Sequence, residues 1–279
     1  EIIKYFEEEK KALDRTKRCE ILKPHVPKVS SLNPNMFGYN YIEGKRFSDI
    51  YNVKLLKEFF DFVKFMYLDN PLSVGTFNQE QFYNNCTTMY QEKTFKRIKS
   101  HEEIDTLEKV TDINGVAVSS IDSLLSIVDW QKINNMAIPV LLHGDMSPEN
   151  IIYDIRKKKF TLIDWREKFG DDMYVGDMYY DLCKLDHALL VNGAVIRSQE
   201  YSVDIKDEFA EIEINFRSNL LKARKLLEEF CIKNSLDFQH VKLLTSLTLL
   251  NISSVHSDKK FNRFLYLYGK LLLTEVLKK

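Results

Sequence analysis

The chain has almost no net charge and no stripe of basic residues. Its 40 Lys and Arg residues nearly balance 41 Asp and Glu residues, which leaves a formal net charge of −1 at pH 7. Nucleic acids and anionic membrane surfaces attract proteins through an excess of clustered positive charge. Here the basic residues are scattered and do not alternate with aromatic residues. We therefore expect no nucleic-acid partner.

Paired cysteines and Cys/His metal motifs are also missing. No two cysteines form a Cys-x-x-Cys unit, and none has a His at metal-ligand spacing. Isolated reduced thiols are typical of cytosolic proteins, so we expect a cytoplasmic location and no disulfide framework. The chain has four cysteines in all: Cys19, Cys86, Cys183 and Cys231.

Long hydrophobic runs are lacking too. No apolar run reaches the roughly 18 residues that span a bilayer, so we expect no membrane span. The first residues, Glu1 to Glu9, are rich in acidic residues and do not resemble a signal peptide. A chain of 279 residues fits one large domain or two modest lobes.

Periodicity predicts helices at both ends and strands in the middle. An apolar face suggests a helix over residues 1–22, ended by Pro24 and Pro27. After Gly176 the chain is expected to stay mostly helical. The fold class is thus α+β, with these further elements: strands 26–29 and 36–42, helices 52–69, 78–111 and 121–135, then strands 138–142, 150–154 and 160–163.

Three oxygen-bearing side chains stand at the ends of the central strands. Asp145 follows the first of these strands, Asn150 begins the second, and Asp164 ends the third. A strand–loop–strand–turn–strand unit would bring them together. Carboxylate and amide oxygens suit Mg²⁺, which leaves sites for substrate phosphates. Phosphoryl transfer needs such a site and an oriented hydroxyl. The alternative is that these residues only cap turns.

The same residues carry a resemblance to a known family. Three motifs occur in order: His143-Gly144-Asp145 followed by Asn150, then Ile163-Asp164-Trp165, then Gly176-Asp177 followed by Asp181-Leu182. This series resembles the aminoglycoside phosphotransferase and choline kinase family of the protein-kinase-like superfamily. The resemblance implies a protein-kinase-like fold with a mostly helical C-terminal lobe, ATP and Mg²⁺ as cofactors, and a small-molecule substrate with a hydroxyl group.

The resemblance also assigns roles to residues of these motifs. It implies Asp145 as the catalytic base, with His143 beside it in the catalytic group as a support. Asn150 and Asp164 are implied as Mg²⁺ ligands. Asp177 and Asp181 are implied as structural supports. Asp181 is implied to brace the catalytic loop.

Upstream the likeness is weaker and covers only part of a nucleotide-binding lobe. Glu9 corresponds to the helix carboxylate that pairs with a nucleotide-binding Lys, although it also fits a solvated acidic face. Tyr41, Ile42 and Glu43 resemble a hinge whose backbone meets adenine. We expect a partial N-terminal lobe over residues 1–43 and a catalytic C-terminal lobe over residues 44–279.

The nucleotide half of the expected site looks incomplete in the sequence. We expect the chain to begin at the Glu9 helix, and it contains no G-x-G-x-x-G loop and no recognisable strand lysine of the V-A-I-K type. Three explanations stay open. Upstream residues are missing from this chain, another domain or polypeptide supplies them, or the protein is a binding module without catalysis.

The expected acceptor is small. Ser147 stands where protein kinases carry a lysine, and no Ala-Pro-Glu sequence follows Asp164. Residues 164–182 resemble a bacterial subgroup of surface-polysaccharide (capsule) gene clusters. This implies a sugar or an amino alcohol such as choline or ethanolamine as substrate, and a fused or associated nucleotidyltransferase domain as partner. An aminoglycoside antibiotic is the alternative acceptor. Candidate substrate-binding residues are Arg166, Asp186 and His187.

Overall fold

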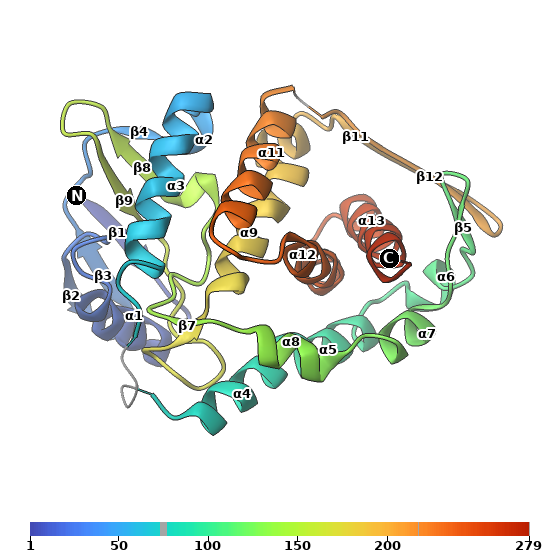
Figure 1. Cartoon of the computed structure of the whole chain (residues 1–279), viewed down its shortest axis with the longest axis horizontal. Coiled ribbons are helices and arrows are strands. Elements are labelled where there is room, and N and C mark those ends of the chain that lie inside the picture. The colour runs from blue at the N-terminus through green and yellow to red at the C-terminus, as the bar shows by residue number, and fades with distance from the viewer. Residues whose placement is uncertain (73–76, 217, 279) are drawn as a thin grey trace. The chain divides into compact units, whose positions relative to one another are not determined.

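The computed structural model describes residues 1–72, 77–216 and 218–278. These divide into two compact units (Figure 1). The first consists of residues 1–86 and 137–185, and the second of residues 87–136 and 186–279. Helices and strands occur in both units, which confirms the predicted α+β class.

The first unit begins with a three-stranded antiparallel sheet, in the order β1 (Ile2–Tyr5), β3 (Met36–Tyr39) and β2 (Val29–Asn33). The prediction of a helix from residue 1 is therefore wrong, because α1 extends only over Glu9–Ile21. The β-branched and aromatic residues at the start of the chain favour a strand when a partner is present. Here β3 is that partner, with Ile2 opposite Tyr39 and Tyr5 opposite Met36.

A second sheet and a buried aromatic cluster follow. The predicted helix over 52–69 is confirmed as α3 (Val53–Tyr67), and Asn52 caps it by accepting a hydrogen bond from the backbone N–H of Leu55. Phe59 of α3 packs on Phe47 and Phe160 at ring-centroid distances of 4.9 and 5.4 Å. The other elements here are β4 (Lys45–Arg46), α2 (Phe47–Ile50), β7 (Pro139–Val140), the 3₁₀ turn η2 (Pro148–Asn150), β8 (Ile151–Asp154), β9 (Lys159–Leu162) and β10 (Gly176–Asp177).

These short strands of the first unit form one three-stranded sheet and one two-stranded pair. The antiparallel sheet β4-β8-β9 contains both strands predicted over 150–154 and 160–163, which confirms them. β7 pairs with β10. The loop between β7 and η2 is thereby held between two strand pairs, and it contains Asp145.

The second unit is mostly helical. Helices α4 (Gln79–Thr87) and α9 (Met178–Leu190) cross the division between the units. The predicted helices 78–111 and 121–135 are each broken into shorter segments. The elements are the π-helical turn η1 (Thr88–Glu92), α5 (Lys93–Lys99), α6 (Ile104–Leu107), β5 (Asp112–Ile113), β6 (Val116–Ala117), α7 (Ile121–Ser126), α8 (Trp130–Met136), α10 (Gly193–Arg197), β11 (Tyr201–Lys206), β12 (Phe209–Ile214), α11 (Ser218–Lys233), α12 (Phe238–Ile252) and α13 (Lys259–Leu277).

The β11–β12 hairpin was not predicted. Residues of β11 alternate between buried and exposed, and Tyr201, Val203 and Ile205 lie opposite Ile214, Ile212 and Ala210. This alternation is the period of a strand and not of a helix. The turn contains Asp207 with a positive φ of 55°, as tight hairpins require.

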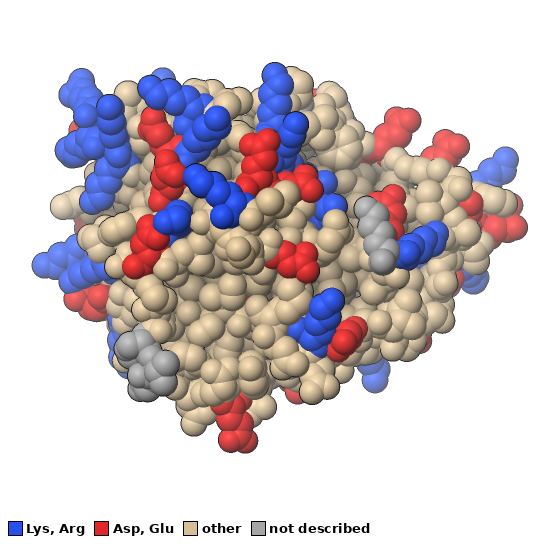
Figure 2. Space-filling view, viewed as in Figure 1, with Lys and Arg blue, Asp and Glu red and all other residues tan. Residues whose placement is uncertain are grey.

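Charged residues of both signs are mixed on the surface. On the face drawn in Figure 2, Lys and Arg side chains lie among Asp and Glu side chains, in keeping with the near-zero net charge. Within residues 1–72, 77–216 and 218–278, no helix has the length and apolar character needed to span a membrane.

Candidate active site

The loop after β7 turns sharply at a glycine. Gly144 has a φ of +89°, a conformation that side chains disfavour. A Cβ added there would lie 2.5 Å from the Cβ of Arg166. The backbone N–H of Arg166 donates to the carbonyl oxygen of His143 at 2.9 Å. Only glycine therefore lets the loop approach the segment after β9 this closely.

His143 uses one ring nitrogen to contact the residue after β9 and the other to contact its own loop. Its Nε2 lies 3.0 Å from the carbonyl oxygen of Ile163, and its Nδ1 accepts from the backbone N–H of Asp145 at 3.3 Å. This pattern assigns the neutral tautomer with the proton on Nε2. Burial lowers the pKa of His143, in agreement with that tautomer. The geometry supports a positioning role for His143 rather than proton transfer.

Asp181 of α9 lies under the same loop and is fully buried. Its carboxylate accepts from the backbone N–H groups of His143 at 2.9 Å, Gly144 at 2.9 Å and Met146 at 3.2 Å. It also accepts from the Tyr67 hydroxyl at 2.5 Å. Burial is the main cause that raises the pKa of Tyr67, and the neighbouring Asp181 carboxylate raises it further. One carboxylate thus satisfies three backbone donors of the loop and fixes its shape.

Asp177 serves the strand that leads into the loop. Its side chain is buried and accepts from the backbone N–H of Ile138 at 2.8 Å. It also accepts from the backbone N–H of Tyr179 at 3.1 Å, at the start of α9. The two supporting carboxylates therefore hold different parts of the same region.

Asp145 and Asn150 are in direct contact. The Asn150 side-chain Nδ2 donates to the Asp145 carbonyl oxygen and to its Oδ2, both at 3.0 Å. Since the amide nitrogen is engaged in this way, the amide oxygen is the group that Asn150 can offer to a cation. The Asp145 side chain keeps 40% of its surface exposed, and its Oδ1 lies 2.8 Å from the Lys184 ammonium.

Asp164 follows β9 with a φ of 57°, in the left-handed region. Residues other than glycine are uncommon in this region, and Asp adopts it more readily than most. Its backbone neighbour Ile163 donates to the Asn150 carbonyl oxygen at 2.9 Å. The structure therefore brings the segments of Asp145, Asn150 and Asp164 together, as the order of the central strands predicted.

A strand lysine that the sequence analysis did not single out is Lys4. It lies in β1, and its ammonium is 2.8 Å from Asp164 Oδ1 and 2.9 Å from Oδ2. The expectation that the chain begins at the Glu9 helix without a strand lysine is wrong. The signal was available in the run Ile2-Ile3-Lys4-Tyr5, which fits a strand better than a helix.

Arg18 supplies a third cation in this region. It is fully buried in α1 and donates to the carbonyl oxygen of Leu142. Burial lowers its pKa to about 10, against the opposing effect of the Asp181 carboxylate. Two of the acidic side chains around the loop are thus paired with a lysine, Asp164 with Lys4 and Asp145 with Lys184, while Asp181 interacts electrostatically with Arg18.

Of the nucleotide-binding residues expected upstream, Glu9, Tyr41 and Glu43 are exposed and Ile42 is half-buried. Glu9 is the first residue of α1. Lys4 pairs with Asp164 and not with Glu9. Tyr41, Ile42 and Glu43 connect β3 to β4 outside any helix or strand, and Tyr41 is 66% exposed. Their exposure leaves them accessible to a ligand, and their roles stay predictions.

The expected substrate-binding residues already have partners in the protein. Arg166 donates to the Lys168 carbonyl oxygen at 3.0 Å and to the Tyr180 hydroxyl at 3.2 Å. Asp186 is fully buried in an ion pair with Arg224, at 2.7 Å. This pairing favours a structural role for Asp186, which like its neighbour His187 lies in the second unit.

The donor set fits a magnesium ion in kind. No group of three or more His, Cys, Asp or Glu side chains suited to a metal occurs within residues 1–72, 77–216 and 218–278. The expected ligands are instead one amide oxygen, from Asn150, and one carboxylate, from Asp164. Mg²⁺ is commonly held by one or two protein oxygens together with waters and phosphate oxygens. The Lys4 ammonium against Asp164 shows that this carboxylate accepts a positive charge.

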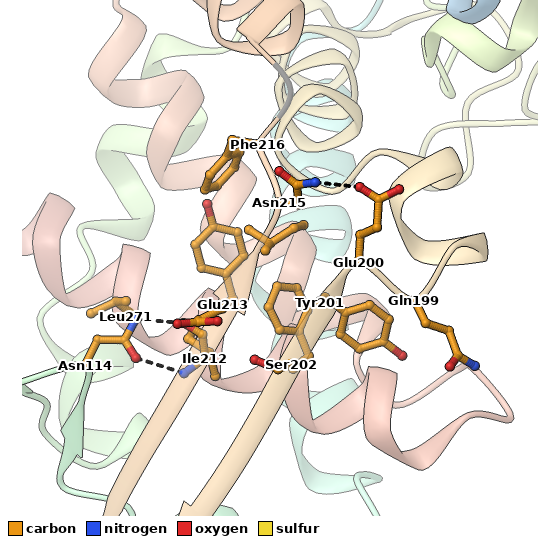
Figure 3. A pocket seen from close by; sticks show the side chains of 13 residues that line it. Asn114, Gln199, Glu200, Tyr201, Ser202, Ile212, Glu213, Asn215, Phe216 and Leu271 are labelled. Carbon is orange, nitrogen blue, oxygen red and sulfur yellow. Dashed lines mark hydrogen bonds between the residues drawn. The ribbon is translucent and has the colours of Figure 1, made fainter.

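A separate cavity lies in the second unit (Figure 3). It has a volume of about 710 Å³ and is bounded by the β11–β12 hairpin and α13. Tyr201 and Phe264 are among the residues that line it. Also in the lining, the Asn215 side-chain amide donates a hydrogen bond to the Glu200 carboxylate at 2.7 Å. None of the residues predicted for catalysis lines it.

Comparisons with known proteins agree with the geometry. Residues 118–199 match the phosphotransferase enzyme family, APH, and this stretch contains Asp145, Asp164 and Asp181. The curated proteins contain no match in sequence. The solved structure of choline kinase LicA from Streptococcus pneumoniae is similar with a TM-score of 0.50 and 15% identity, over 98% of this chain and 85% of that one. This likeness shows a protein-kinase-like fold, as predicted.

Two further structures resemble the chain. Plasmodium vivax ethanolamine kinase has a TM-score of 0.47 and 14% identity, over 98% of this chain and 74% of that one. An aminoglycoside phosphotransferase from Streptomyces rimosus, in complex with ADP and streptomycin, has a TM-score of 0.46 and 14% identity, over 99% and 85%. The family match, together with the fold, supports the predicted class of small-molecule kinase.

Proposed function

We propose that this protein is an ATP- and Mg²⁺-dependent kinase that phosphorylates a hydroxyl group of a small molecule. The observation that carries the proposal is the contact of Asp145 with Asn150, beside an Asp164 that is paired with Lys4. A base, two oxygen ligands and a lysine are the parts that phosphoryl transfer requires.

Each residue has a defined task in this proposal. The exposed Asp145 carboxylate accepts the proton of the acceptor hydroxyl while the hydroxyl oxygen attacks the γ-phosphorus. Asn150 and Asp164 hold Mg²⁺, which when bound neutralises charge on the phosphate oxygens. Lys4 contacts the nucleotide phosphates from β1. His143 and Asp181 keep the loop in the shape that presents Asp145.

The acceptor is a small alcohol. The similar structures include a choline kinase, an ethanolamine kinase and an enzyme bound to streptomycin. Choline, ethanolamine and streptomycin all carry hydroxyl groups. We favour a sugar or an amino alcohol, and a role in surface-polysaccharide synthesis with a fused or associated nucleotidyltransferase domain. This finer proposal depends on the resemblance of residues 164–182 alone.

The proposal predicts acceptor-dependent formation of ADP. Calorimetry is expected to show binding of ATP that requires Mg²⁺. A coupled assay is expected to show ADP release that rises with one member of a panel of choline, ethanolamine, hexoses and streptomycin. Failure to bind ATP with Mg²⁺ would contradict the proposal and favour a binding module without catalysis. That alternative was motivated by the apparent lack of a strand lysine, and the position of Lys4 in β1 beside Asp164 supports the kinase instead.

Replacing Lys4 tests the nucleotide half of the site. Lys4→Met is expected to weaken the binding of ATP with Mg²⁺ by about 30- to 100-fold, because it removes one charge-assisted contact to phosphate. Calorimetry measures the change directly. Lys28→Met, at an exposed position of the same unit, is the matched control and should bind like the wild type. Equal affinities for the Lys4 and Lys28 variants would exclude Lys4 from the nucleotide site.

A further inference from the structure

The catalytic loop supplies no positive charge of its own. Between His143 and Asn150 there is no Lys or Arg, although Asp145 and Glu149 are acidic. Ser147 is engaged in local structure, because its Oγ accepts from the backbone N–H of Glu149 at 3.3 Å and caps η2. A phosphoryl group in transfer carries negative charge that must be met by fixed positive groups. A cation for it must come from another element.

Lys184 of α9 lies at the required place. It follows Asp181 by three residues, and side chains with this spacing share one face of a helix. Asp181 is hydrogen-bonded to the backbone of the loop, and Lys184 reaches the side chain of Asp145, with Nζ at 2.8 Å from Oδ1. The same helix face thus contacts both the frame of the loop and its base.

The ammonium of Lys184 is permanently charged. Only 18% of its side chain is exposed. Burial opposes the charged form, but Asp145 and Tyr180 outweigh it and raise the pKa of Lys184. The charge is therefore held in a partly dry site, where an interaction with a phosphate oxygen is stronger than in water.

The contacts of Asp145 place the phosphoryl group within reach of Lys184. Asn150 engages Oδ2 and Lys184 engages Oδ1, so the carboxylate is oriented by both oxygens. The acceptor hydroxyl must lie on this carboxylate, with its oxygen about 3 to 3.5 Å from the phosphorus before reaction. Lys184 has three N–H donors, and the Asp145 contact needs one. The remaining donors are close enough to meet an oxygen of the transferring group.

The other cations of the region are engaged elsewhere. Lys4 pairs with Asp164 on the metal side of the site. Arg166 is directed to Tyr180 and to the Lys168 carbonyl oxygen. Arg18 is buried and donates to the Leu142 carbonyl oxygen. Lys184, by contrast, is in direct contact with the base.

We infer that Lys184 is a catalytic residue that binds the transferring phosphoryl group and orients Asp145. The inference rests on the proposed kinase activity. In the step, a bond forms between the acceptor oxygen and the γ-phosphorus while the bond from this phosphorus to the β–γ bridging oxygen breaks. The hydroxyl proton goes to Asp145, and ADP leaves with the electron pair of the broken bond. Lys184 donates to a non-bridging oxygen of the transferring group throughout.

The test uses a mimic of the transferring group. Aluminium fluoride binds with ADP and Mg²⁺ as a charged analogue of the phosphoryl group in transit. The wild type is expected to bind ADP more tightly when fluoroaluminate is present. Lys184→Met should bind ADP alone as the wild type does, but should lose most of the gain from fluoroaluminate. Its kcat should fall by about 10²- to 10³-fold, as for loss of one preorganised donor, with the acceptor KM within about threefold.

Two further variants distinguish charge from structure. Lys184→Arg keeps the positive charge and should recover part of the fluoroaluminate gain. Lys157→Met removes a largely exposed lysine in the turn between β8 and β9 and should behave as the wild type. Thermal unfolding is recorded for every variant. If Lys184→Met does not fold, Lys184→Gln replaces it, with the same expected results.

The outcomes separate this inference from the proposed function. A wild type that binds neither ATP nor ADP with Mg²⁺ would contradict the kinase itself. A wild type with a fluoroaluminate gain, together with a folded Lys184→Met that keeps the whole gain, would overturn the inference and leave the kinase standing. Equal losses of ADP affinity and of the fluoroaluminate gain would also overturn it, because they would indicate only a disturbed site.

Discussion

Asp145→Asn is expected to lower kcat by about 10³-fold or more, since removal of a general base typically costs 10²- to 10⁴-fold. The amide has the shape of the carboxylate but cannot take the proton of the acceptor. The contact with Lys184 would also lose its ionic character. Binding of ATP with Mg²⁺ should change little, because the metal ligands are other residues. Steady-state kinetics with the acceptor, and calorimetry with the nucleotide, measure the two effects.

The matched control for this variant lies in the same loop. Glu149→Gln makes the same chemical change four residues later and should retain the wild-type kcat. A folded Asp145→Asn protein with wild-type turnover would remove Asp145 from the role of base. In that case the contact between Asp145 and Asn150 would be a loop-stabilising feature only.

Asp181→Ala is expected to have the largest effect on stability. It removes the acceptor of three backbone N–H groups and of the Tyr67 hydroxyl. It also leaves the buried Arg18 guanidinium without the carboxylate that offsets its burial. Breaking a buried charged network from one side typically costs about 3–5 kcal/mol in the free energy of unfolding. Urea denaturation measures this loss, and catalysis should be lost with it.

Two comparisons decide the meaning of that result. Asp181→Asn keeps one acceptor oxygen and should cost less than Asp181→Ala. Asp171→Ala removes a carboxylate that is 88% exposed and paired with Lys168, and it should change stability by less than about 0.5 kcal/mol. An Asp181→Ala protein as stable as the Asp171→Ala protein would show that the loop does not depend on Asp181.

The sequence analysis singled out the acidic residues of the candidate site but not the lysines that the structure places beside them. Asp145, Asn150 and Asp164 could be found because the order of short strands brings strand ends together, and each residue belongs to a motif. The partners of the lysines could not be found from the order of the strands. Lys4 is 160 residues from Asp164 along the chain, and long flexible side chains reach partners that no local pattern indicates. Lys184 had a local signal, because it follows Asp181 by three residues on a helix.

The errors in secondary structure have a similar cause. The first strand and the β11–β12 hairpin are stabilised by pairing with other strands, and this pairing decided against helix. Charged residues near both segments resembled a helical surface. Strand preference depends on such context more than helix preference does, so the long amphipathic helix α3 was predicted more easily than β1.

The way α1 is attached has a consequence for the motion of this helix. Arg18 joins it to the Leu142 carbonyl oxygen next to the catalytic loop, and the Arg15 carbonyl oxygen accepts from the Trp165 indole at 2.9 Å, next to Asp164. Arg15 also pairs with Glu167 at 3.4 Å. Swinging this helix outward would expose a buried guanidinium and break contacts on both sides of the site. We therefore expect α1 to stay in place while nucleotide and acceptor exchange.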